Sequence, residues 1–573
     1  MVFLRTWAVF LSGLSLLAIS AFAGDVRTTT LRIANKNISV DGFPRSAVLA
    51  NGKFPGTAIS INKGDRMVVN VINELTDPTM FRSTSIHWHG LFMKGSSYDD
   101  GAAFVTQCPI IPNNSFTYDF IPTYCLIPQV LHPTDHFAGR HFLVPLPSLY
   151  ATMRWPTCTA DQFVSSSMIL MIHTGYFFFQ YSDSSIDSCL LLAGIREPLS
   201  MMLEFDLERL STNRMSMIVV TTIIALADWF HQPTRGTAFP LYTTNLINGK
   251  GRFTGGPAAE LAVINVQKGL RYRFRLISMS CGPNFVFSID EHSMTIIEAD
   301  GVLTQPLIVD SIQIYTGQRY SFILDANQPE VNYWVRSLPN IGDTTFDNGV
   351  NSAVLHYSRA DSSEPKTKQT PSIRPLNEAD LRPLVPTVVP GRPFVGGADV
   401  NINLNIGLDF NTLRFSLNGV SFTPPTAPAL LQILSGAHLA SDLLPAGSYF
   451  ALPPNKVIEV SIPGGADPAG PHPFHLHGHN FFVVRSTNMS DYNFIDPIVR
   501  DVVNTGFPGD NVTFRFVTDN AGPWFLHCHI DLHMDIGLAV VFAEDIPTIS
   551  KQDTPAAWKN LCPAYNALNP SQL

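Results

Sequence analysis

Three histidine clusters restrict the fold of this 573-residue chain more than any other part of its sequence. They are HWHG at 87–90, HPFHLHGH at 472–479 and HCHIDLH at 527–533. On a β-strand, residues i and i+2 share a face, so His87 with His89, and His475 with His477, can each grip one metal cluster. A lone histidine is more often structural than a ligand, whereas paired histidines of this form predict metal centres on strands.

The third cluster adds a cysteine between two histidines. His527 and His529 point to one face of the predicted strand and Cys528 points to the other, so two metal centres can lie on opposite sides of one short peptide. A thiolate among imidazoles favours copper, and a blue-copper site needs two histidines and one cysteine, with a weak or absent axial ligand. His472, Cys528 and His533 meet that need.

Strand signals dominate the rest of the chain. Residues 29–40, 66–73, 271–277 and 457–462 mix β-branched and aromatic residues with polar ones, and Asn-Gly and Asp-Gly turns separate such segments. Long helical periodicity is scarce, so the sequence predicts an all-β protein of several β-sandwich units in series. The length suggests roughly three domains of about 150 residues each. A Pro-rich stretch at 362–393 is interpreted as an interdomain linker.

The N-terminal end predicts export. Arg5 precedes an apolar run at 7–19, and an A-x-A cleavage pattern follows at 21–23, so residues 1–23 are interpreted as a signal peptide. A transmembrane anchor is disfavoured because the run is short. The net charge of −9 argues against a nucleic-acid partner. We therefore expect a secreted, extracellular protein that is a monomer and binds neither nucleic acid nor membrane. Weak support for secretion comes from glycosylation sequons at Asn37, Asn113, Asn488 and Asn511.

These motifs resemble those of the multicopper oxidases, and within them the fungal laccases. The resemblance covers nearly the whole mature chain outside residues 123–218. Besides HPFHLHGH and HWHG, it rests on DGAAFVTQCPI at 100–110 and HCHIDLHMDIGLAVVFAE at 527–544. It implies three cupredoxin-like Greek-key β-sandwich domains, with a trinuclear copper cluster between the first and the third. On this basis we expect the domains at 24–155, 219–370 and 371–573.

The resemblance implies four copper ions and a role for each histidine cluster. His472, Cys528 and His533 would hold the type 1 copper that takes electrons from substrate. The trinuclear ligands would be His87 and His475 for type 2 copper, and His89, His477, His527 and His529 for part of the type 3 pair. Leu538 stands ten residues after Cys528, where relatives can carry Met. Because leucine cannot ligate, the reduction potential should be raised.

The implied reaction is that of a laccase, a benzenediol:oxygen oxidoreductase. It is one-electron oxidation of phenols and aromatic amines, coupled to reduction of dioxygen to water. Lignin phenols, pigment precursors and toxic phenols would all use the same copper centres. The alternative in the same superfamily is a metal-ion oxidase, which would call for carboxylates or a Met-rich patch near His472 and His533. Asp531 and Asp535 lie within the shared motif and do not discriminate between the two.

The resemblance also assigns cysteines and substrate residues. Of the seven cysteines, Cys108 would pair with Cys562, with two unrelated buried thiols as the alternative, and Cys281 matches a disulfide position. Gly282 stands where many relatives have an acidic residue that orients the phenol or amine, which argues against carboxylate anchoring there. The last two matches are Asn340, at a substrate-pocket position or a plain turn, and Asp228, which we interpret as structural.

One family motif is absent. A His-Ser-His motif should supply one ligand to each type 3 copper, yet no H-x-H occurs between His89 and His475. With permitted codons and a one-base shift of frame, residues 141–155 can be read as TFWYHSHLSTQRCDG, and residues 168–173 in the other frame as YDPDDP. We hypothesise that residues 123–218 contain frame-shifted exon and retained intron; the alternative is a lineage-specific insertion. Translated as printed, the chain would be a copper-binding remnant in which dioxygen reduction fails or is very slow.

Overall fold

The computed structural model describes residues 24–56, 58–61, 64–122, 150–152, 219–229, 231, 242–465 and 470–569. The predicted signal peptide and nearly all of the segment at 123–218 lie outside these residues. Within them, no helix is long and apolar enough to cross a membrane. Strands dominate and helices are short, which confirms the all-β prediction.

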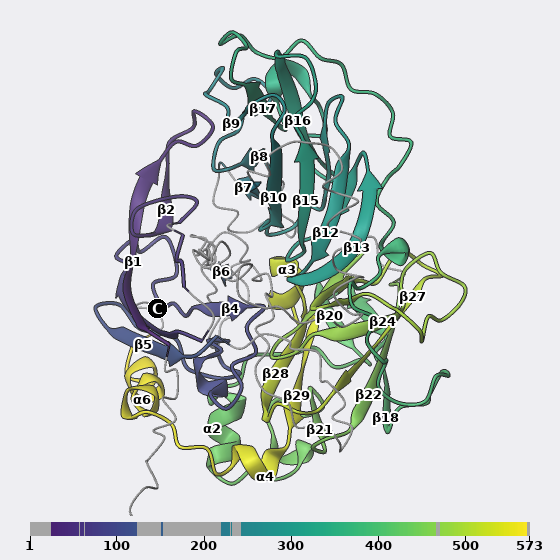
Figure 1. The fold of residues 1–573 in the computed structure, drawn as a ribbon. Coiled ribbons are helices and arrows are strands. Elements are labelled where there is room, and N and C mark those ends of the chain that lie inside the picture. The colour runs from purple at the N-terminus through teal and green to yellow at the C-terminus, as the bar shows by residue number, and fades with distance from the viewer. Residues whose placement is uncertain are drawn as a thin grey trace, which may run out of the picture.

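The N-terminal part is a four-stranded sheet with a small ladder beside it (Figure 1). The sheet has the order β2-β1-β3-β5, in which β1 and β3 run parallel. Burial alternates along β3 as its sequence predicts, since Met67, Val69 and Val71 are buried. The elements are β1 (Val26–Ile38), β2 (Arg45–Ala50), β3 (Arg66–Glu74), β4 (His87–His89), a 3-10 turn η1 (Ser97–Asp99), β5 (Ser115–Phe120) and β6 (Tyr150–Thr152). β4, which carries the first histidine pair, is antiparallel to β6.

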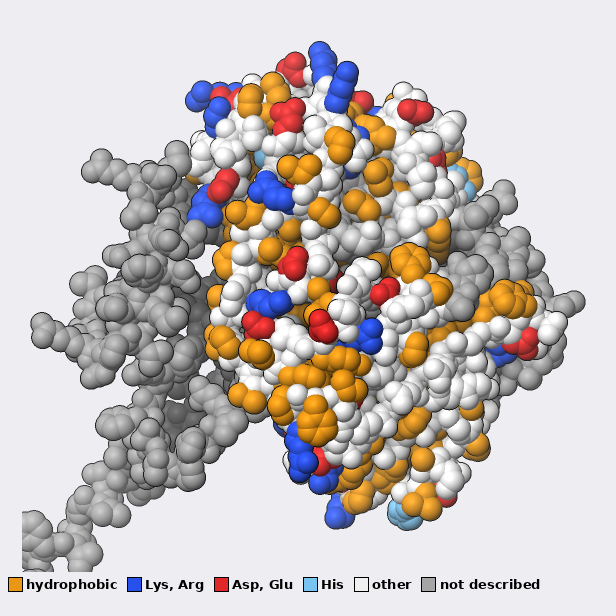
Figure 2. Space-filling view, turned by 90° about the vertical axis from the view of Figure 1, so that its right-hand side faces the viewer, with side chains coloured by type: hydrophobic (Ala, Val, Ile, Leu, Met, Phe, Trp, Pro, Cys, Tyr) orange, Lys and Arg blue, Asp and Glu red, His pale blue; other side chains and the backbone are white. Residues whose placement is uncertain are grey.

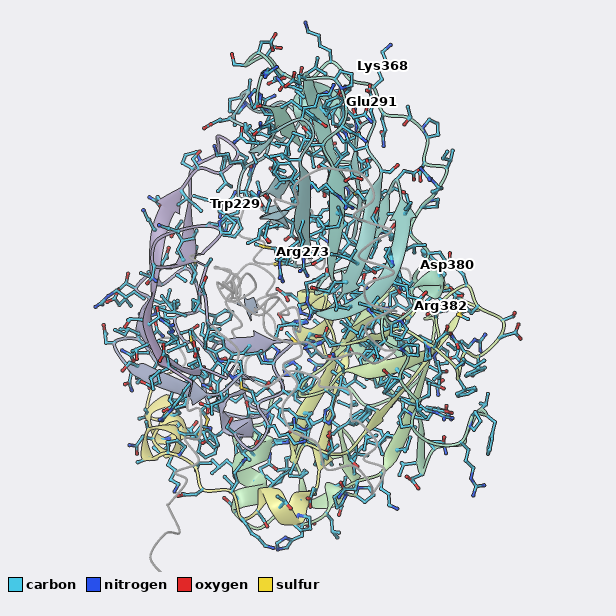
Figure 3. The ribbon with its side chains drawn as sticks, in the orientation of Figure 1. Trp229, Arg273, Glu291, Lys368, Asp380 and Arg382 are labelled. Carbon is cyan, nitrogen blue, oxygen red and sulfur yellow. A yellow bond between two sulfur atoms is a disulfide. The ribbon has the colours of Figure 1, made fainter. Side chains whose placement is uncertain are left out.

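The middle part is a sandwich of two sheets. One has the order β13-β12-β15-β10-β7-β8 and the other β14-β11-β16-β17-β9. Their elements are β7 (Val219–Trp229), β8 (Thr244–Ile247), β9 (Val263–Val266), β10 (Arg271–Ser278), β11 (Phe285–Ile289), β12 (Met294–Ala299), β13 (Val302–Val309), β14 (Ile312–Ile314), β15 (Arg319–Asp325), β16 (Asn332–Pro339), η2 (Asp347–Gly349) and β17 (Ser352–Tyr357). Figure 3 shows Trp229 where this sandwich meets the N-terminal part, and the Arg45 guanidinium lies 4.9 Å from its ring centroid.

The C-terminal part is a second sandwich that carries the other two histidine clusters. Its sheets have the orders β18-β22-β27-β24-β25 and β21-β29-β28-β23-β26. The strands are β18 (Val400–Asn403), β19 (Ile406–Asp409), β20 (Arg414–Leu417), β21 (Tyr449–Leu452), β22 (Val457–Pro463), β23 (Pro473–Leu476), β24 (Phe481–Arg485), β25 (Val499–Arg500), β26 (Val502–Asn504), β27 (Asn511–Val517), β28 (Gly522–Cys528) and β29 (Ala539–Glu544). The helices are α2 (Ala429–Leu434), α3 (Asp531–Asp535), α4 (Ile546–Ile549), α5 (Ala556–Lys559) and α6 (Leu561–Asn566), with a 3-10 turn η4 (Ala440–Asp442).

The Pro-rich stretch at 362–393 connects the two sandwiches and contains only one 3-10 turn, η3 (Glu378–Asp380), as regular structure. It lies along β13, where Gln305 N donates to Arg382 O at 2.8 Å, and the Arg382 side chain is 3.2 Å from Asp496 of the C-terminal part. Figure 3 shows Asp380 and Arg382 where the two sandwiches meet. The interpretation of this stretch as a linker agrees with the structure.

The N-terminal and C-terminal parts are joined covalently. Cys108 and Cys562 form the predicted disulfide, and Trp558 Nε1 donates to Thr106 O at 3.0 Å. Helix α6 consequently lies beside the N-terminal sheet, although it follows that sheet by more than 400 residues (Figure 1). Cys281 is buried in the part of the chain that the structure describes, whereas Cys125, Cys158 and Cys189 lie outside it, so the disulfide expected at Cys281 stays a prediction.

Candidate metal centres

His472, Cys528 and His533, which we call the cysteine site, converge at one buried point. His472 Nδ1 lies 3.1 Å from His533 Nδ1, and Cys528 Sγ lies 3.7 Å from each of these nitrogens. His472 precedes β23, Cys528 ends β28, and His533 lies in α3, so a single domain supplies all three atoms. A metal ion with bonds of about 2.0 Å to nitrogen and about 2.3 Å to sulfur fits this triangle. Two imidazoles and a thiolate are the donor set of blue copper.

The surroundings of the cysteine site are apolar. The Phe415 ring packs against His472 and His533, with centroids 5.3 and 4.7 Å apart respectively. Leu538 is fully buried, its N–H donates to His533 O at 2.9 Å, and its carbonyl accepts from Cys528 N at 3.0 Å. Leu538 therefore stands next to the site, where it offers no side-chain ligand, as the sequence predicts.

Six further histidines form a second buried group, the histidine cluster. They are His87 and His89 on β4, His475 on β23, His477 just after it, and His527 and His529 at the end of β28. The N-terminal part supplies two of these histidines and the C-terminal part supplies four. His89 Nδ1 lies 3.1 Å from His529 Nε2, and His477 Nε2 lies 3.1 Å from His527 Nε2. Each of these two pairs presents two nitrogens to one point, as two ligands of one metal would.

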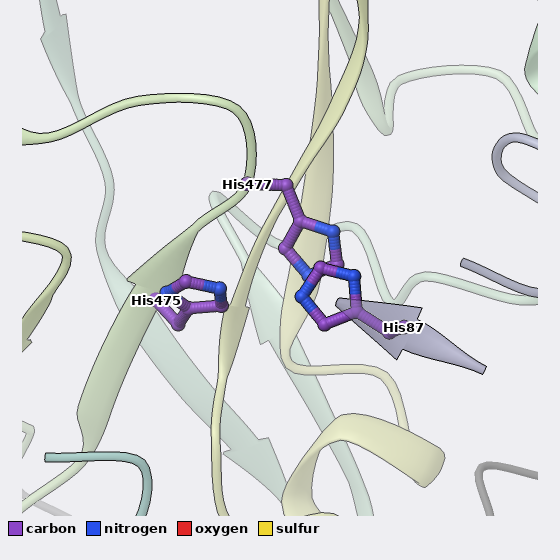
Figure 4. Close-up of side chains that lie close together, drawn as sticks. All are labelled: His87, His475 and His477. Atoms are coloured by element: carbon purple, nitrogen blue, oxygen red, sulfur yellow. The ribbon is translucent and has the colours of Figure 1, made fainter. Parts of the chain in front are cut away.

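His87 and His475 form the third pair. His87 Nδ1 bonds to Asp100 O and His475 Nδ1 to Asp501 O, each at 2.9 Å. These contacts place the ring proton on Nδ1 and leave Nε2 as a lone-pair donor. Both Nε2 atoms are buried and have no hydrogen-bond partner in the part of the chain that the structure describes. Because buried polar atoms are rarely left unpaired, this fits a metal ion between them. Figure 4 shows both rings converging with His477.

Burial keeps these imidazoles neutral. Together with the charges of neighbouring histidines, it lowers the pKa of His477 to about 4 and holds the pKa of His89, His475 and His527 well below the ordinary value. Neutral imidazole is the form that binds a metal ion, so no proton has to be displaced at neutral pH.

The peptide around Cys528 separates the two centres as strand alternation predicts. Cys528 Sγ lies in the cysteine site, whereas the rings of His527 and His529 lie in the histidine cluster. Because His527 and His529 are the chain neighbours of Cys528, a single peptide bond on each side of Cys528 connects the two centres. The His-Ser-His motif that the resemblance implies is absent from the sequence, and the segment 123–218 that should carry it lies almost entirely outside the described residues.

The sequence analysis did not identify Asp100, which contacts two histidines of the cluster. Its carboxylate lies 3.2 Å from His87 Nδ1 and 2.9 Å from His477 Nδ1. Burial acts to raise the pKa of Asp100, but the two histidines outweigh it and hold the pKa below its ordinary value. A carboxylate in this position orients ligand imidazoles and makes them more basic. The available signal was its place in the motif DGAAFVTQCPI.

A pocket enclosing about 220 Å³, part of it open to solvent, lies close to α3 and contains Asp228. Asp228 Oδ1 accepts from Cys281 N at 2.8 Å, and Cys281 O accepts from Asp531 N at 2.9 Å. Asp531 is two residues from His533. Asp228 Oδ2 is buried and has no hydrogen-bond partner among the described residues, and burial raises the pKa of Asp228 to about 7. The structural interpretation of Asp228 therefore accounts for Oδ1 only.

The two predicted substrate residues differ in placement. A Cβ atom on Gly282 would lie 1.3 Å from the hydroxyl of Tyr242, which lines the Asp228 pocket, so an acidic side chain at position 282 would require the Tyr242 ring to move. Asn340 is exposed, and its side chain accepts from Asn284 N at 2.9 Å. That bond joins two loops, which favours the turn interpretation of Asn340.

Comparisons with known proteins agree with this geometry. Three family models described as multicopper oxidase match residues 32–127, 221–360 and 422–547. Laccase-4 of Trametes villosa is 49% identical, with 97% of this chain and 96% of that protein covered. The laccase of Phlebia radiata is 47% identical, with 99% of each covered.

Solved structures show the same fold. The laccase from Botrytis aclada superposes with a TM-score of 0.73 at 25% identity and covers 96% of this chain and 94% of that chain. Fet3p, described as a multicopper oxidase that functions in iron import, superposes with a TM-score of 0.72 at 22% identity and covers 95% and 96%.

Proposed function

Because this chain belongs to the laccases of the multicopper oxidase family, we propose that its cysteine site oxidises phenols and aromatic amines and that its histidine cluster serves dioxygen reduction. The observation that carries the proposal is the position of Cys528, whose sulfur lies in one donor set while His527 and His529 lie in the other. Copper bound there supplies the one-electron oxidation of substrate and the reduction of dioxygen to water.

We propose the pocket beside α3 as the substrate site. The Asp228 Oδ2 atom can accept a hydrogen bond, and then the proton, from a phenol or aromatic amine as the substrate loses an electron. Pro283, Pro339 and Ile341 give the pocket apolar walls for an aromatic ring. Tyr242, which lies over Gly282, completes one wall.

Ligand assignments follow from the paired nitrogens. We propose His472, Cys528 and His533 for type 1 copper, with Leu538 as a non-ligating neighbour. We propose the pair His87 and His475 for type 2 copper. For type 3 copper we propose the pairs His89 with His529 and His477 with His527.

The metal-ion oxidase is the less favoured alternative. The curated relatives that cover nearly the whole chain are laccases, whereas the likeness to Fet3p at 22% identity concerns the fold alone. The candidate pocket also supports an organic substrate, since it combines one carboxyl oxygen with apolar walls.

We further propose that the chain is cleaved after Ala23, is secreted and acts outside the cell as a monomeric glycoprotein. The side chains of Asn37, Asn113 and Asn488 are exposed and accessible to glycosylation. Charged side chains of both signs are scattered among hydrophobic ones on the face in Figure 2. The domain limits 24–155, 219–370 and 371–573 are part of this proposal.

Anaerobic reduction of the copper-loaded chain tests the substrate proposal without requiring dioxygen chemistry. We expect 2,6-dimethoxyphenol to bleach the blue absorption band with saturation kinetics, and ferrous ion to bleach it without saturation. The variant Asp228→Asn should raise the phenol concentration that gives half-maximal bleaching and leave the ferrous reaction unchanged. A phenol reaction that is slower than the ferrous reaction and unaffected by Asp228→Asn would favour the metal-ion oxidase.

A further inference from the structure

The middle domain reaches the histidine cluster through the turn between β14 and β15. Gly317 lies in that turn, and a Cβ atom there would be 2.6 Å from Cδ2 of His529. Only a residue without a side chain fits at this approach, and its φ of +83° also favours glycine. The turn therefore packs directly against a proposed type 3 ligand, although no residue of the middle domain binds the metal in the proposed assignment.

Arg319, the first residue of β15, places its guanidinium at the junction of all three domains. It forms a bidentate ion pair with Asp501, in which Nη1 donates to Oδ1 and Nη2 donates to Oδ2 at 2.7 Å. Nη1 also lies 2.9 Å from His89 Nε2. Both charged side chains are only 2% exposed, so water hardly competes with the ion pair. The two parallel hydrogen bonds fix the orientation of the guanidinium relative to the carboxylate.

The same ion pair explains the glycine of HWHG. A Cβ atom on Gly90 would lie 2.9 Å from Arg319 Nη2 and 3.3 Å from Asp501 Oδ2. The space beside β4 is occupied by the guanidinium of the middle domain and the carboxylate of the C-terminal domain. Consequently the first histidine motif is shaped by residues that lie more than 200 positions further along the chain.

Asp501 contacts two proposed copper ligands. Its Oδ1 lies 3.4 Å from His89 Nε2, and its backbone oxygen bonds to His475 Nδ1 at 2.9 Å. The rings of His89 and His475 stack with centroids 3.8 Å apart. Arg319 Nη1 only donates, so its 2.9 Å contact makes His89 Nε2 the acceptor in the metal-free protein. A metal at Nδ1 would place the ring proton on Nε2, where Asp501 Oδ1 is the acceptor within reach.

Arg319 is itself held rigidly. Its backbone N–H donates to Asp300 Oδ1 at 2.8 Å, and Asp300 Oδ2 accepts from Arg500 Nε at 2.8 Å. Asp300 thus links the start of β15 to the residue that precedes Asp501. The position of the Asp501 carboxylate is determined from the middle domain through both Arg319 and Asp300.

We propose that Arg319 is a positioning residue for the histidine cluster, which fixes His89 and His475 through Asp501 so that they can hold copper. This inference rests on the proposed copper sites. The claim that Arg319 fixes the positions of His89 and His475 also applies to the protein without metal. The middle domain thereby contributes to the trinuclear centre without supplying a ligand.

The chain offers a matched control. Arg336 forms another buried bidentate pair in the middle domain, with Nε 2.7 Å from Asp290 Oδ1 and Nη2 2.8 Å from Asp290 Oδ2. We would compare Arg319→Gln, Arg319→Lys and Arg336→Gln, and measure copper per chain, the type 2 signal by electron paramagnetic resonance and the blue band. We expect Arg319→Gln to weaken copper binding by the histidine cluster about tenfold or more. The blue band should remain, Arg319→Lys should lose less copper, and Arg336→Gln should lose none.

Unchanged copper binding in Arg319→Gln, or an equal loss in Arg336→Gln, would overturn the inference. A second measurement needs no copper: crystal structures of the metal-free variants. We expect the separation of 3.1 Å between His89 Nδ1 and His529 Nε2 to be lost in Arg319→Gln and kept in Arg336→Gln. If the unmodified chain binds no copper at the cluster, the proposed function fails, while the metal-free structures still decide the role of Arg319.

Discussion

The cysteine site and the histidine cluster differ in how much of the chain each requires. The cysteine site takes its ligands from one domain, with His472 and His533 only 61 residues apart. In the histidine cluster, His89 and His529 are 440 residues apart, and the middle domain adds Arg319 between them. A site assembled within one domain can survive damage elsewhere, whereas a site assembled from three domains depends on all of them. The disrupted segment at 123–218 is therefore expected to affect the two sites unequally.

The largest effect should come from that segment. We expect the spliced transcript to encode His-Ser-His in frame, and we expect the protein translated from it to consume dioxygen with copper and a phenol. The chain as printed should be slower by more than about 100-fold, since losing an outer-shell partner alone can cost that much. An oxygen electrode makes the comparison, with 2,6-dimethoxyphenol as substrate. Equal rates of oxygen consumption by the two proteins would show that the histidine cluster does not depend on the segment 123–218.

Reciprocal ligand substitutions should separate the two sites. Cys528→Ser should abolish the blue band because it removes the thiolate, yet leave the type 2 copper signal. His87→Gln should remove the type 2 signal and leave the blue band, because His87 lies only in the histidine cluster. Absorption and electron paramagnetic resonance spectra of the copper-loaded variants provide the readout. Loss of both signals in either variant would show that the sites do not form independently.

Removing the disulfide should loosen the cluster before the cysteine site. The double variant Cys108→Ser with Cys562→Ser should lower the free energy of unfolding by about 2–5 kcal/mol. Because the bridge ties the N-terminal part to α6, a chelator should extract type 2 copper faster than blue copper. Timed copper loss during chelation tests this order. Simultaneous loss would mean that the bridge stabilises the whole molecule evenly.

The rate of phenol oxidation at the cysteine site should depend on pH through Asp228, whereas copper binding by the histidine cluster should not depend on this residue. The carboxyl has a pKa of about 7, so its accepting form predominates above that pH, and phenol oxidation should rise through it. Asp228→Asn should flatten this rise and increase the phenol concentration that gives half-maximal bleaching roughly tenfold or more, since a hydrogen bond to a charged group contributes about 1.5–3 kcal/mol. Rates of anaerobic bleaching at several phenol concentrations, from pH 5 to 9, measure both.

The same shift affects stability with a defined sign. The folded chain binds the Asp228 proton more tightly than the unfolded chain, so the free energy of unfolding should fall as pH rises from the ordinary value of 3.8 to about 7. Asp228→Asn should be less sensitive over this range in denaturant titrations. A steeper dependence in the variant would contradict the buried, protonated carboxyl.

The smallest effect should come from Leu538→Met. A thioether near Cys528 adds a weak ligand, which stabilises the cupric state and lowers the reduction potential without loss of the blue band. A redox titration of the blue band measures this change. The histidine cluster should keep its copper signals, and a change there would indicate that the two sites communicate through Leu538.

The sequence predicted which histidines and which cysteine come together better than it predicted the residues that hold them in place. Alternation along a strand places Cys528 and His527 on opposite faces, and this rule depends only on neighbouring positions. Arg319 and Asp501 could not be found in this way, because their importance arises from contacts across domain boundaries. The sequence analysis assigned Asp228 a structural role, which agrees with the bond from Cys281 N to Oδ1. It did not predict that Oδ2 would be buried with no hydrogen-bond partner among the described residues.

The fold was predictable for a similar reason. The strand patterns at 66–73 and 457–462 correspond to β3 and β22. Burial alternates along β3, which is a local property, whereas the five inner residues of β22 are all buried. The fit of Tyr242 over Gly282 could not be predicted, because it requires two distant loops to pack together.

The bridge between Cys108 and Cys562 also sets an order of events during synthesis. The two cysteines are 454 residues apart, which corresponds to about 20–90 s of translation at roughly 5–20 residues per second. For most of that interval the first histidine pair exists without the strands that will face it. Copper supplied early would meet only half of the cluster, where it would bind weakly and in the wrong geometry. Metal delivery is therefore best timed after the chain has been released and its last helix has closed against the first sheet.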